Sequence, residues 1–307
     1  MQFGTTLETG RHRRWHVADP KPANDLATPI HLITILYRSS QSFAGFLDGL
    51  QAQDRADWRL HVIDNGDPQS VAMAEARADP RISITRNPAN FGFARAANQG
   101  MRKALAEGAK TVVLINNDII MSPDLLGALC EAERQLPGAV MSPRIMDAKR
   151  PDIAGYAGGG IDRSWVYQNV HYPYDPAITE PQLVEFAPGC CLLIPTSVLD
   201  RVGFLDERFF VYWEDTDFCL RLNQAGIPIY YLPTISLLHK GGESSGGLNT
   251  PAFYRLYFAS YMRFMRKHFG FTHATATLLR LARKEWEQGT LPGLMLKTGA
   301  MLKGLIR

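Results

Sequence analysis

The sequence predicts an α/β protein: a Rossmann-like, mostly parallel sheet with helices on both faces, followed by C-terminal helices. From Ile30 onward, short apolar runs alternate with helical segments, which is the pattern of strand–helix–strand units. The chain has 307 residues and a hydrophobic fraction of 46%, which is ordinary for a globular protein with a sizeable core. No apolar run reaches about 18 residues, so no membrane-spanning helix is expected.

Four apolar runs are the expected strands of the first half, and a helix is expected after each. The runs are 30–37, 59–66, 81–87 and 111–118. The helix after the fourth run is expected to have Ser122 as its N-cap and Pro123 at its first position. Ligands of parallel sheets bind at the carboxyl ends of the strands, so polar residues there are candidates for a site. They are Tyr37, Arg38, Asp64, Asn65, Asn87, Asn116, Asn117 and Asp118.

The alternation of strand and helix patterns stops after Pro137, where Gly, Pro and aromatic residues predict irregular loops and a few mixed strands. The glycine-rich tracts at 157–160 and 241–247 are interpreted as mobile loops, because neither has a phosphate-loop spacing. A buried strand is expected at 185–195, and a helix is expected from the acidic stretch near Glu214 to about Ala225.

The expected domain organisation follows these changes in pattern. The segments are a polar arm at 1–28, a catalytic domain at 29–250 with halves at about 29–137 and 138–250, and a basic helical segment at 251–307.

The charge distribution and the cysteine content limit which cellular compartments and which partners are expected for this protein. Residues 251–307 hold ten Lys or Arg and two acidic residues, a net charge of +8, whereas residues 1–250 carry −5. A basic segment on a mildly acidic body favours an anionic surface as partner. The four cysteines lack metal-ligand spacing, and the N-terminus lacks the apolar region of a secretory signal. A reducing, cytoplasmic compartment is therefore expected.

The stretch "VYWEDTDFCLRL" concentrates three carboxylates at the expected start of a helix. Asp217 lies four residues before Arg221, a favourable helical ion pair. Glu214 has two open readings, a helix-capping residue or a contact to the acceptor. Asp215 has no local partner, and a carboxylate beside other carboxylates and aromatic rings should have a raised pKa, which suits a general base.

Asp118 and His239 each have two readings. Asp118 follows an apolar strand, where a carboxylate can hold a divalent cation and through it a diphosphate, but Asn-Asn-Asp is also good turn chemistry. His239 ends an apolar run, and a lone histidine is more often structural. If the fold brings it to an aspartate, it becomes a candidate ligand for a metal such as Mn²⁺.

The chain resembles the inverting glycosyltransferases of family 2, which have the GT-A fold, and among them the rhamnosyltransferase-like branch. The matching pieces occur in the family's order and cover roughly residues 30–245. They are "ITILYRS", "VIDNGD", "NPANFGFARAANQGM", "LINNDI", "PGCCLLIP", "GFLDERFFVYWEDTDFCLRLNQAGIPIYYLP" and "LLHKGG".

The resemblance implies that one group of residues contacts the nucleotide. Asp64 would touch the base or ribose with Tyr37 nearby, and Arg95 would lie against the nucleotide. Asn116 and Asn117 stand in the first two positions of the family's D-x-D motif and are expected at the donor.

A second group is implied at the reacting centre. Asp118 and His239 would bind the metal, Mn²⁺ or Mg²⁺, and Asp215 would be the catalytic base. Trp213 and Glu214 are expected to contact the substrate.

These roles imply a metal-dependent hexosyltransferase of bacterial surface polysaccharide synthesis. The donor is a nucleotide-diphosphate sugar, with dTDP-rhamnose favoured and galactofuranose or glucose donors open. The acceptor is a glycan or lipid-linked oligosaccharide. The alternative is a catalytically silent nucleotide-sugar binding or scaffold protein, favoured only by Asn116 in place of the first D-x-D carboxylate.

The C-terminal residues 290–307 form a basic amphipathic pattern on a helical wheel. The apolar arc holds Leu294, Met295, Met301, Leu302, Leu305 and Ile306. Such a helix either lies at a membrane interface, here the inner face of the plasma membrane, or packs on the catalytic domain or a second subunit. A nucleic-acid partner is not expected, because the aromatic residues of this segment come at helical spacing.

Overall fold

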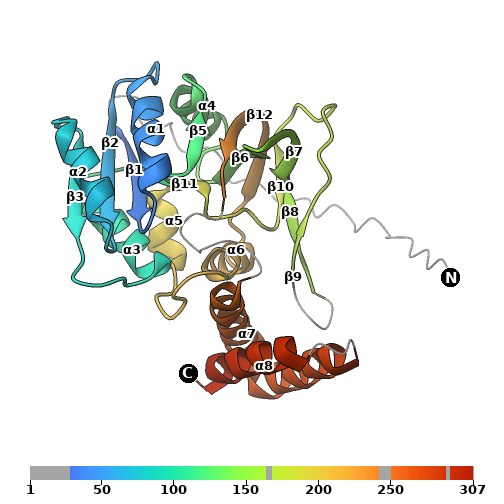
Figure 1. The fold of residues 1–307 in the computed structure, drawn as a ribbon. Coiled ribbons are helices and arrows are strands. Elements are labelled where there is room, and N and C mark those ends of the chain that lie inside the picture. The colour runs from blue at the N-terminus through green and yellow to red at the C-terminus, as the bar shows by residue number, and fades with distance from the viewer. Residues whose placement is uncertain (1–27, 164–167, 242–249, 288–290, 307) are drawn as a thin grey trace.

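The computed structural model describes residues 28–163, 168–241, 250–287 and 291–306. Nearly all of the expected polar arm at 1–28, and most of the tract at 241–247, lies outside these residues. Within them the chain forms an α/β body with a separate layer of C-terminal helices beneath it (Figure 1).

The first half is a parallel sheet in the order β4-β1-β2-β3, as the alternation of strands and helices predicts. Its strands are β1 (Ile30–Leu36), β2 (Trp58–Asp64), β3 (Ile82–Arg86) and β4 (Thr111–Ile115). Its helices are α1 (Ser40–Gln51), α2 (Pro68–Ala76), α3 (Phe93–Ala106) and α4 (Leu125–Gln135). The prediction of Ser122 as the cap of α4 is wrong by two residues, because Asp124 is the N-cap and the Ser122 carbonyl accepts from Leu125 in the preceding turn.

The second half extends this sheet with mixed pairing, in the order β10-β12-β6-β11 up to β4. Its elements are β5 (Ile119–Met121), β6 (Val140–Asp147), β7 (Arg150–Tyr156), β10 (Gln182–Val184), β11 (Cys191–Pro195), β12 (Ile229–His239), α5 (Thr196–Val202) and α6 (Glu214–Gln224). The strand expected at 185–195 is thus confined to its last five residues.

The glycine tract at 157–160 is not a mobile loop. It leads into β8 (Gly159–Asp162), which pairs with β9 (Gln168–His171) in a small second sheet. A side chain at Gly159 would place its Cβ 3.0 Å from the Val170 carbonyl oxygen, and one at Gly160 would lie 2.7 Å from the Tyr172 hydroxyl. The glycines therefore allow close packing here.

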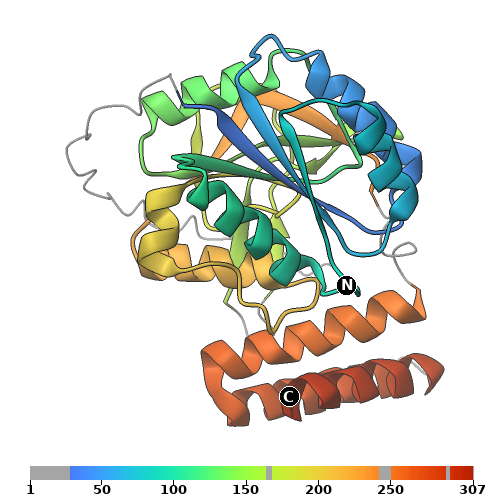
Figure 2. The same ribbon diagram turned by 90° about the vertical axis from the view of Figure 1, so that its left-hand side faces the viewer.

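Two C-terminal helices, α7 (Pro251–Glu287) and α8 (Leu291–Ile306), form a hairpin that packs below the body (Figure 2). α7 is kinked at Gly270, which has a φ of 84°. The first part of α7 lies between the body and α8. None of the described helices is both long and apolar enough to cross a membrane.

The residues of the apolar arc expected on the last helix differ in burial. Met301 and Leu305 are buried against the chain, whereas Leu302 is 45% and Ile306 is 73% exposed. The side chains of Leu294 and Met295 lie outside the described part. The arc is therefore partly a packing face, and two of its members remain on the surface.

Candidate active site

A cavity of about 1210 Å³ opens where the carboxyl ends of β1 and β4 meet β12 and the start of α6. Both halves of the sheet line it, and α7 contributes Leu256. Of the predicted site residues, those that line it are Tyr37, Asn116, Asn117, Asp118, Glu214, Asp215 and His239. This position agrees with the rule that ligands of parallel sheets bind beyond the strand ends.

Asp118 and His239 meet in this cavity although 121 positions separate them in sequence. The antiparallel pairing of β5 with β12 sets His239 opposite Ile119, next to Asp118. The His239 Nε2 lies 3.0 Å from the Asp118 Oδ1, yet this buried oxygen makes no hydrogen bond with the described residues. Asn116 Nδ2 lies 3.4 Å from the same Nε2.

This donor set fits a divalent cation. A carboxylate oxygen, an imidazole nitrogen and, after an amide flip, the Asn116 oxygen are ligand types that Mn²⁺ accepts. A buried carboxylate oxygen left without a hydrogen bond costs free energy, and a bound cation would remove that cost. The residues present are therefore compatible with the expected metal site.

Asp215 lies half-buried at the second position of α6, and the structure corrects the view that it lacks a partner. Its Oδ2 accepts from the Gly189 N–H at 3.2 Å, and its Oδ1 accepts from the N–H of Thr216 at 2.7 Å. Burial nonetheless raises the pKa of Asp215, because these hydrogen bonds offset the desolvation only in part.

Glu214 is 6% exposed and makes no side-chain cap of α6. Burial, and then the charge of Asp215, raise the pKa of Glu214 well above its usual range, so this carboxyl is the one favoured to be protonated. Its Oε2 is buried and has no hydrogen-bond partner among the described residues. It lines the same cavity, which leaves a donor or acceptor group available there.

The backbone before these acids is held in an unusual conformation. Tyr212 and Trp213 have φ values of 68° and 70°, the left-handed region that non-glycine residues rarely adopt. Each such residue costs on the order of 1–3 kcal/mol unless its surroundings hold it in place.

Contacts from α7 hold this segment. The Ser260 hydroxyl donates to the Val211 carbonyl at 2.9 Å, and the Trp213 ring packs on Tyr261 and Phe264 with ring centres 4.8 and 5.0 Å apart. Trp213 is buried and is not among the residues that line the cavity, and its observed contacts support the helix start. Its contact with the substrate stays a prediction.

Three other predicted residues, Asp64, Asn117 and Arg95, make contacts within the protein. The Asp64 Oδ1 accepts from the N–H groups of Gly66 and Asp67, which closes the turn after β2. The Asn117 side chain donates to the Ile35 carbonyl. Arg95 is exposed and its guanidinium lies 4.1 Å from the Phe91 ring centre, outside the cavity lining.

The sequence reasoning missed several lining residues. Asn90 and Phe93 line the cavity from the first half of the sheet, and Gly189 and Lys240 do so from the second. Asn65, a candidate because it follows a strand, also lines the cavity, whereas the role of the Gly189 N–H depends on how β11 approaches α6.

Outside this cavity, one group of metal-type ligands occurs among the described residues: His31, His61 and Glu107. His31 Nδ1 and His61 Nε2 are 2.9 Å apart, while the ring centres are 5.1 Å apart and the ring planes differ by 13°. This separation is that of a hydrogen bond, in which one ring nitrogen carries the hydrogen and the other accepts it. One hydrogen bond between two neutral imidazoles therefore accounts for this buried contact without a metal ion.

Comparison with known proteins identifies the family of this chain. Residues 32–203 match the family described as "Glycosyl transferase family 2". The chain is 27% identical over 240 residues to the N-acetylglucosaminyl-diphospho-decaprenol L-rhamnosyltransferase of Mycobacterium tuberculosis, covering 70% of this chain and 77% of that protein. It is 26% identical over 200 residues to the dTDP-rhamnosyl transferase RfbF of Shigella flexneri, covering 62% and 63%.

A solved structure extends the comparison to the fold. The crystal structure of GalNAc-T7 with UDP, GalNAc and Mn²⁺ superposes with a TM-score of 0.63 at 12% identity, covering 79% of this chain and 48% of that one. That likeness concerns the fold alone. The family match covers more than half of the chain, and the protein therefore belongs to glycosyl transferase family 2.

Proposed function

We propose that this protein is a metal-dependent, inverting hexosyltransferase of bacterial surface polysaccharide synthesis. The favoured donor is dTDP-rhamnose, because the two relatives described above are both named as rhamnosyl transferases. The acceptor is a hydroxyl of a glycan or of a lipid-linked oligosaccharide. The observation that carries the proposal is that one cavity contains both Asp215 and the Asp118–His239 pair.

In this proposal the donor nucleotide lies over the ends of β1 and β2, near Tyr37 and Asn65, with its diphosphate toward Asp118 and His239. We also assign substrate binding to Asp64, Arg95, Asn116, Asn117 and Trp213. Among these residues Asn116 is favoured most, because it lines the cavity beside His239. Asp118 and His239 would hold a Mn²⁺ or Mg²⁺ ion, which would supply several kcal/mol by neutralising charge on the leaving diphosphate.

Asp215 takes the proton of the acceptor hydroxyl as its oxygen attacks the anomeric carbon. The bond from that carbon to the diphosphate oxygen breaks on the opposite face, and configuration inverts. General-base catalysis supplies about 10²–10⁴ in rate. The raised pKa of Asp215 increases its proton affinity, and Glu214 is positioned to contact the acceptor.

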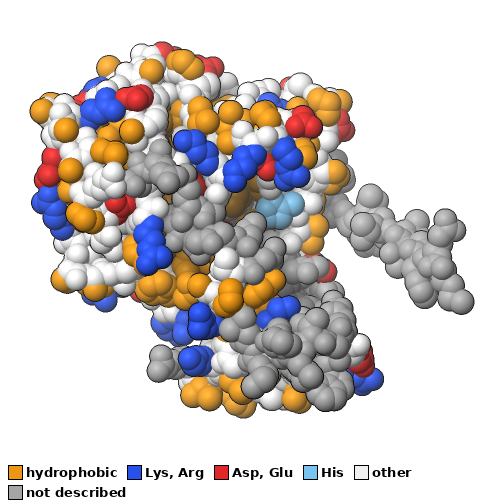
Figure 3. All heavy atoms as spheres, in the orientation of Figure 1, with side chains coloured by type: hydrophobic (Ala, Val, Ile, Leu, Met, Phe, Trp, Pro, Cys, Tyr) orange, Lys and Arg blue, Asp and Glu red, His pale blue; other side chains and the backbone are white. Residues whose placement is uncertain are grey.

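We further propose that the protein works in the cytoplasm at the inner face of the plasma membrane, contacting it through the C-terminal hairpin. Support comes from the net charge of +8 in residues 251–307 and from the exposed side chains of Leu302 and Ile306. Figure 3 shows hydrophobic and Lys or Arg side chains gathered at the lower end of the molecule, over α7 and α8. Self-association through the C-terminal helices stays a prediction.

Asp215→Asn tests the proposal. This variant should bind the donor as the wild type does, seen as an equal thermal shift, and lose at least about 100-fold in turnover. The matched control is Asp200→Asn, the same change at an exposed position of α5, which should keep full turnover. Near-normal turnover of Asp215→Asn would remove it as the base. A wild type that neither transfers nor hydrolyses any sugar of a donor panel with Mn²⁺ or Mg²⁺ would support the silent-scaffold alternative.

A further inference from the structure

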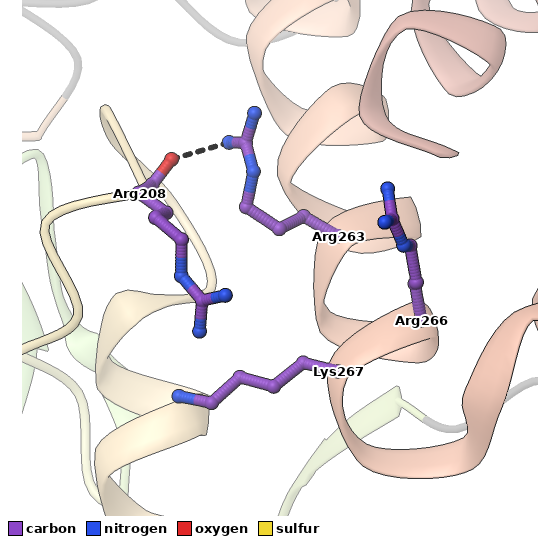
Figure 4. Close-up of a pocket in the computed structure, with 4 residues that line it drawn as sticks. All are labelled: Arg208, Arg263, Arg266 and Lys267. Atoms are coloured by element: carbon purple, nitrogen blue, oxygen red, sulfur yellow. Dashed lines mark hydrogen bonds between the residues drawn. The ribbon is translucent and has the colours of Figure 1, made fainter. Parts of the chain in front are cut away.

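A second, smaller cavity lies between the loop that follows α5 and the helix α7. Its volume is about 130 Å³, and its lining consists of four cationic residues: Arg208, Arg263, Arg266 and Lys267. Figure 4 shows Arg208 on the loop and the other three side chains on consecutive turns of α7. The Arg263 guanidinium donates to the Arg208 carbonyl, so the loop and the helix are tied together at the cavity.

Two carboxylates balance part of this charge. Asp206 pairs with Arg208 at 2.6 Å and with Lys267 at 2.8 Å. Asp217 also pairs with Lys267, but its other oxygen already accepts from Arg221 at 2.9 Å. The cavity therefore keeps a positive excess.

Arg266 contributes most clearly to that excess. No carboxylate of the described residues pairs with it, and it donates to the backbone carbonyls of Leu305 and Ile306 at 2.9 and 3.1 Å. These bonds place the C-terminal end of α8 beside the cavity. Ile306 is 73% exposed there, and Leu302, one helical turn earlier, is 45% exposed. An anion-attracting cavity thus borders an exposed apolar edge.

We propose that this cavity binds the phosphate group of an anionic membrane lipid while Leu302 and Ile306 enter the adjoining apolar layer. Guanidinium groups match phosphate oxygens with two parallel hydrogen bonds, and they bind phosphate more directionally than lysine does. A cationic cavity next to exposed apolar side chains suits a lipid, whose phosphate and acyl chains are joined. This inference rests on the proposed membrane location and adds that a lipid phosphate is the group recognised there.

The test measures binding of the full chain to vesicles of phosphatidylglycerol and phosphatidylcholine, and to vesicles of phosphatidylcholine alone. Two variants remove the same charge from different places. Arg208→Gln/Arg266→Gln removes two cations of the cavity, and Arg280→Gln/Arg283→Gln removes two exposed cations of α7 outside it. Each cation near an anionic surface contributes a general attraction, so both variants should lose some affinity.

A specific site predicts that the cavity variant binds anionic vesicles at least about tenfold more weakly than the control variant does. The single variant Arg266→Gln, which keeps the Arg208–Asp206 pair, should show the same direction if the double variant is unstable. Equal loss in both variants would overturn the site in favour of diffuse attraction. Absence of binding of the wild type to anionic vesicles would overturn it as well.

A competition experiment with a soluble anion distinguishes a lipid phosphate from free phosphate as the ligand. Inorganic pyrophosphate at millimolar concentration should compete with vesicles for the wild type, because it offers the same chemistry. A wild type that binds pyrophosphate but no vesicles would overturn the lipid as ligand. Sugar transfer to a soluble acceptor should be unchanged in both variants, so loss of vesicle binding with intact transfer is distinct from failure of the proposed enzyme.

Discussion

Asp215 and Asp217 lie two residues apart on α6, and their pKa values move in opposite directions. Burial alone would raise both. At Asp217 the hydrogen bond from His268 and the charges of Arg221 and Lys267 outweigh burial and lower the pKa. At Asp215 no cationic side chain contributes, the hydrogen bonds, chiefly from Gly189 and Thr216, offset burial only in part, and the pKa stays raised. The same side chain therefore serves as a structural anion at one position and as a candidate base at the other.

The buried pair of His31 and His61 predicts a pH-dependent stability. Burial, and then the neighbouring His31, lower the pKa of His61 from 6.5 to about 4. Between these values the unfolded state binds a proton that the folded state excludes, so stability should be complete above about pH 6.5 and fall as the pH drops toward 4. The contribution lost is on the order of a few kcal/mol.

Urea unfolding at pH 7.5 and pH 5.0 measures this loss. His61→Gln should reduce the difference between the two pH values, whereas His171→Gln, at a histidine near the surface, should leave it as in the wild type. An unchanged difference in His61→Gln would assign the acid sensitivity to other groups.

At the level of elements, α7 lies beyond the segment 32–203 that matches the family, yet it holds the start of α6. Ser260 and the aromatic residues of α7 support the left-handed Tyr212 and Trp213, and Lys267 and His268 reach Asp217. The position of Asp215 therefore depends on residues of α7 that lie 45 or more positions later in the chain, from Ser260 onward. The hairpin is a support of the site as well as a candidate membrane contact.

The contact between α7 and α8 predicts opposite effects for two glycine substitutions. A Cβ at Gly304 would lie 2.0 Å from the Ala259 carbonyl oxygen, so Gly304→Ala should force the helices apart and cost about 1–3 kcal/mol. Gly299→Ala meets nothing within 4 Å and should be neutral or stabilise by up to about 1 kcal/mol. Chemical denaturation measures both, and equal stabilities would mean that α8 does not pack here.

At the scale of the whole molecule, the site exists only where two differently built halves of one sheet meet. The parallel half brings Tyr37, Asn65 and Asp118, and the mixed half brings Asp215 and His239. The cavity lies between them, so a nucleotide that spans it contacts both halves and should stabilise the whole body.

This arrangement predicts stabilisation by nucleotide that depends on metal. With Mn²⁺, dTDP at about 100 times its Kd should add about 2.7 kcal/mol to the free energy of unfolding and raise Tm by several degrees. Asp118→Asn should lose most of this shift, whereas the exposed control Asp152→Asn should keep it. A shift that is equal with EDTA and with Mn²⁺ would argue against a metal at Asp118.

The sequence by itself determined the alternation of strands and helices, the acidic start of α6 and the Asp217–Arg221 pair, at 2.9 Å, because these depend on local periodicity and helical spacing. The family resemblance placed Asp118, Asp215 and His239 in one site. Only the tertiary structure decided that Gly189 bonds to Asp215, that Asn117 donates to the Ile35 carbonyl, and that Lys267 and His268 reach Asp217. These contacts join residues far apart in the chain, and their geometry is set by how β11, α6 and α7 pack, which no local pattern encodes.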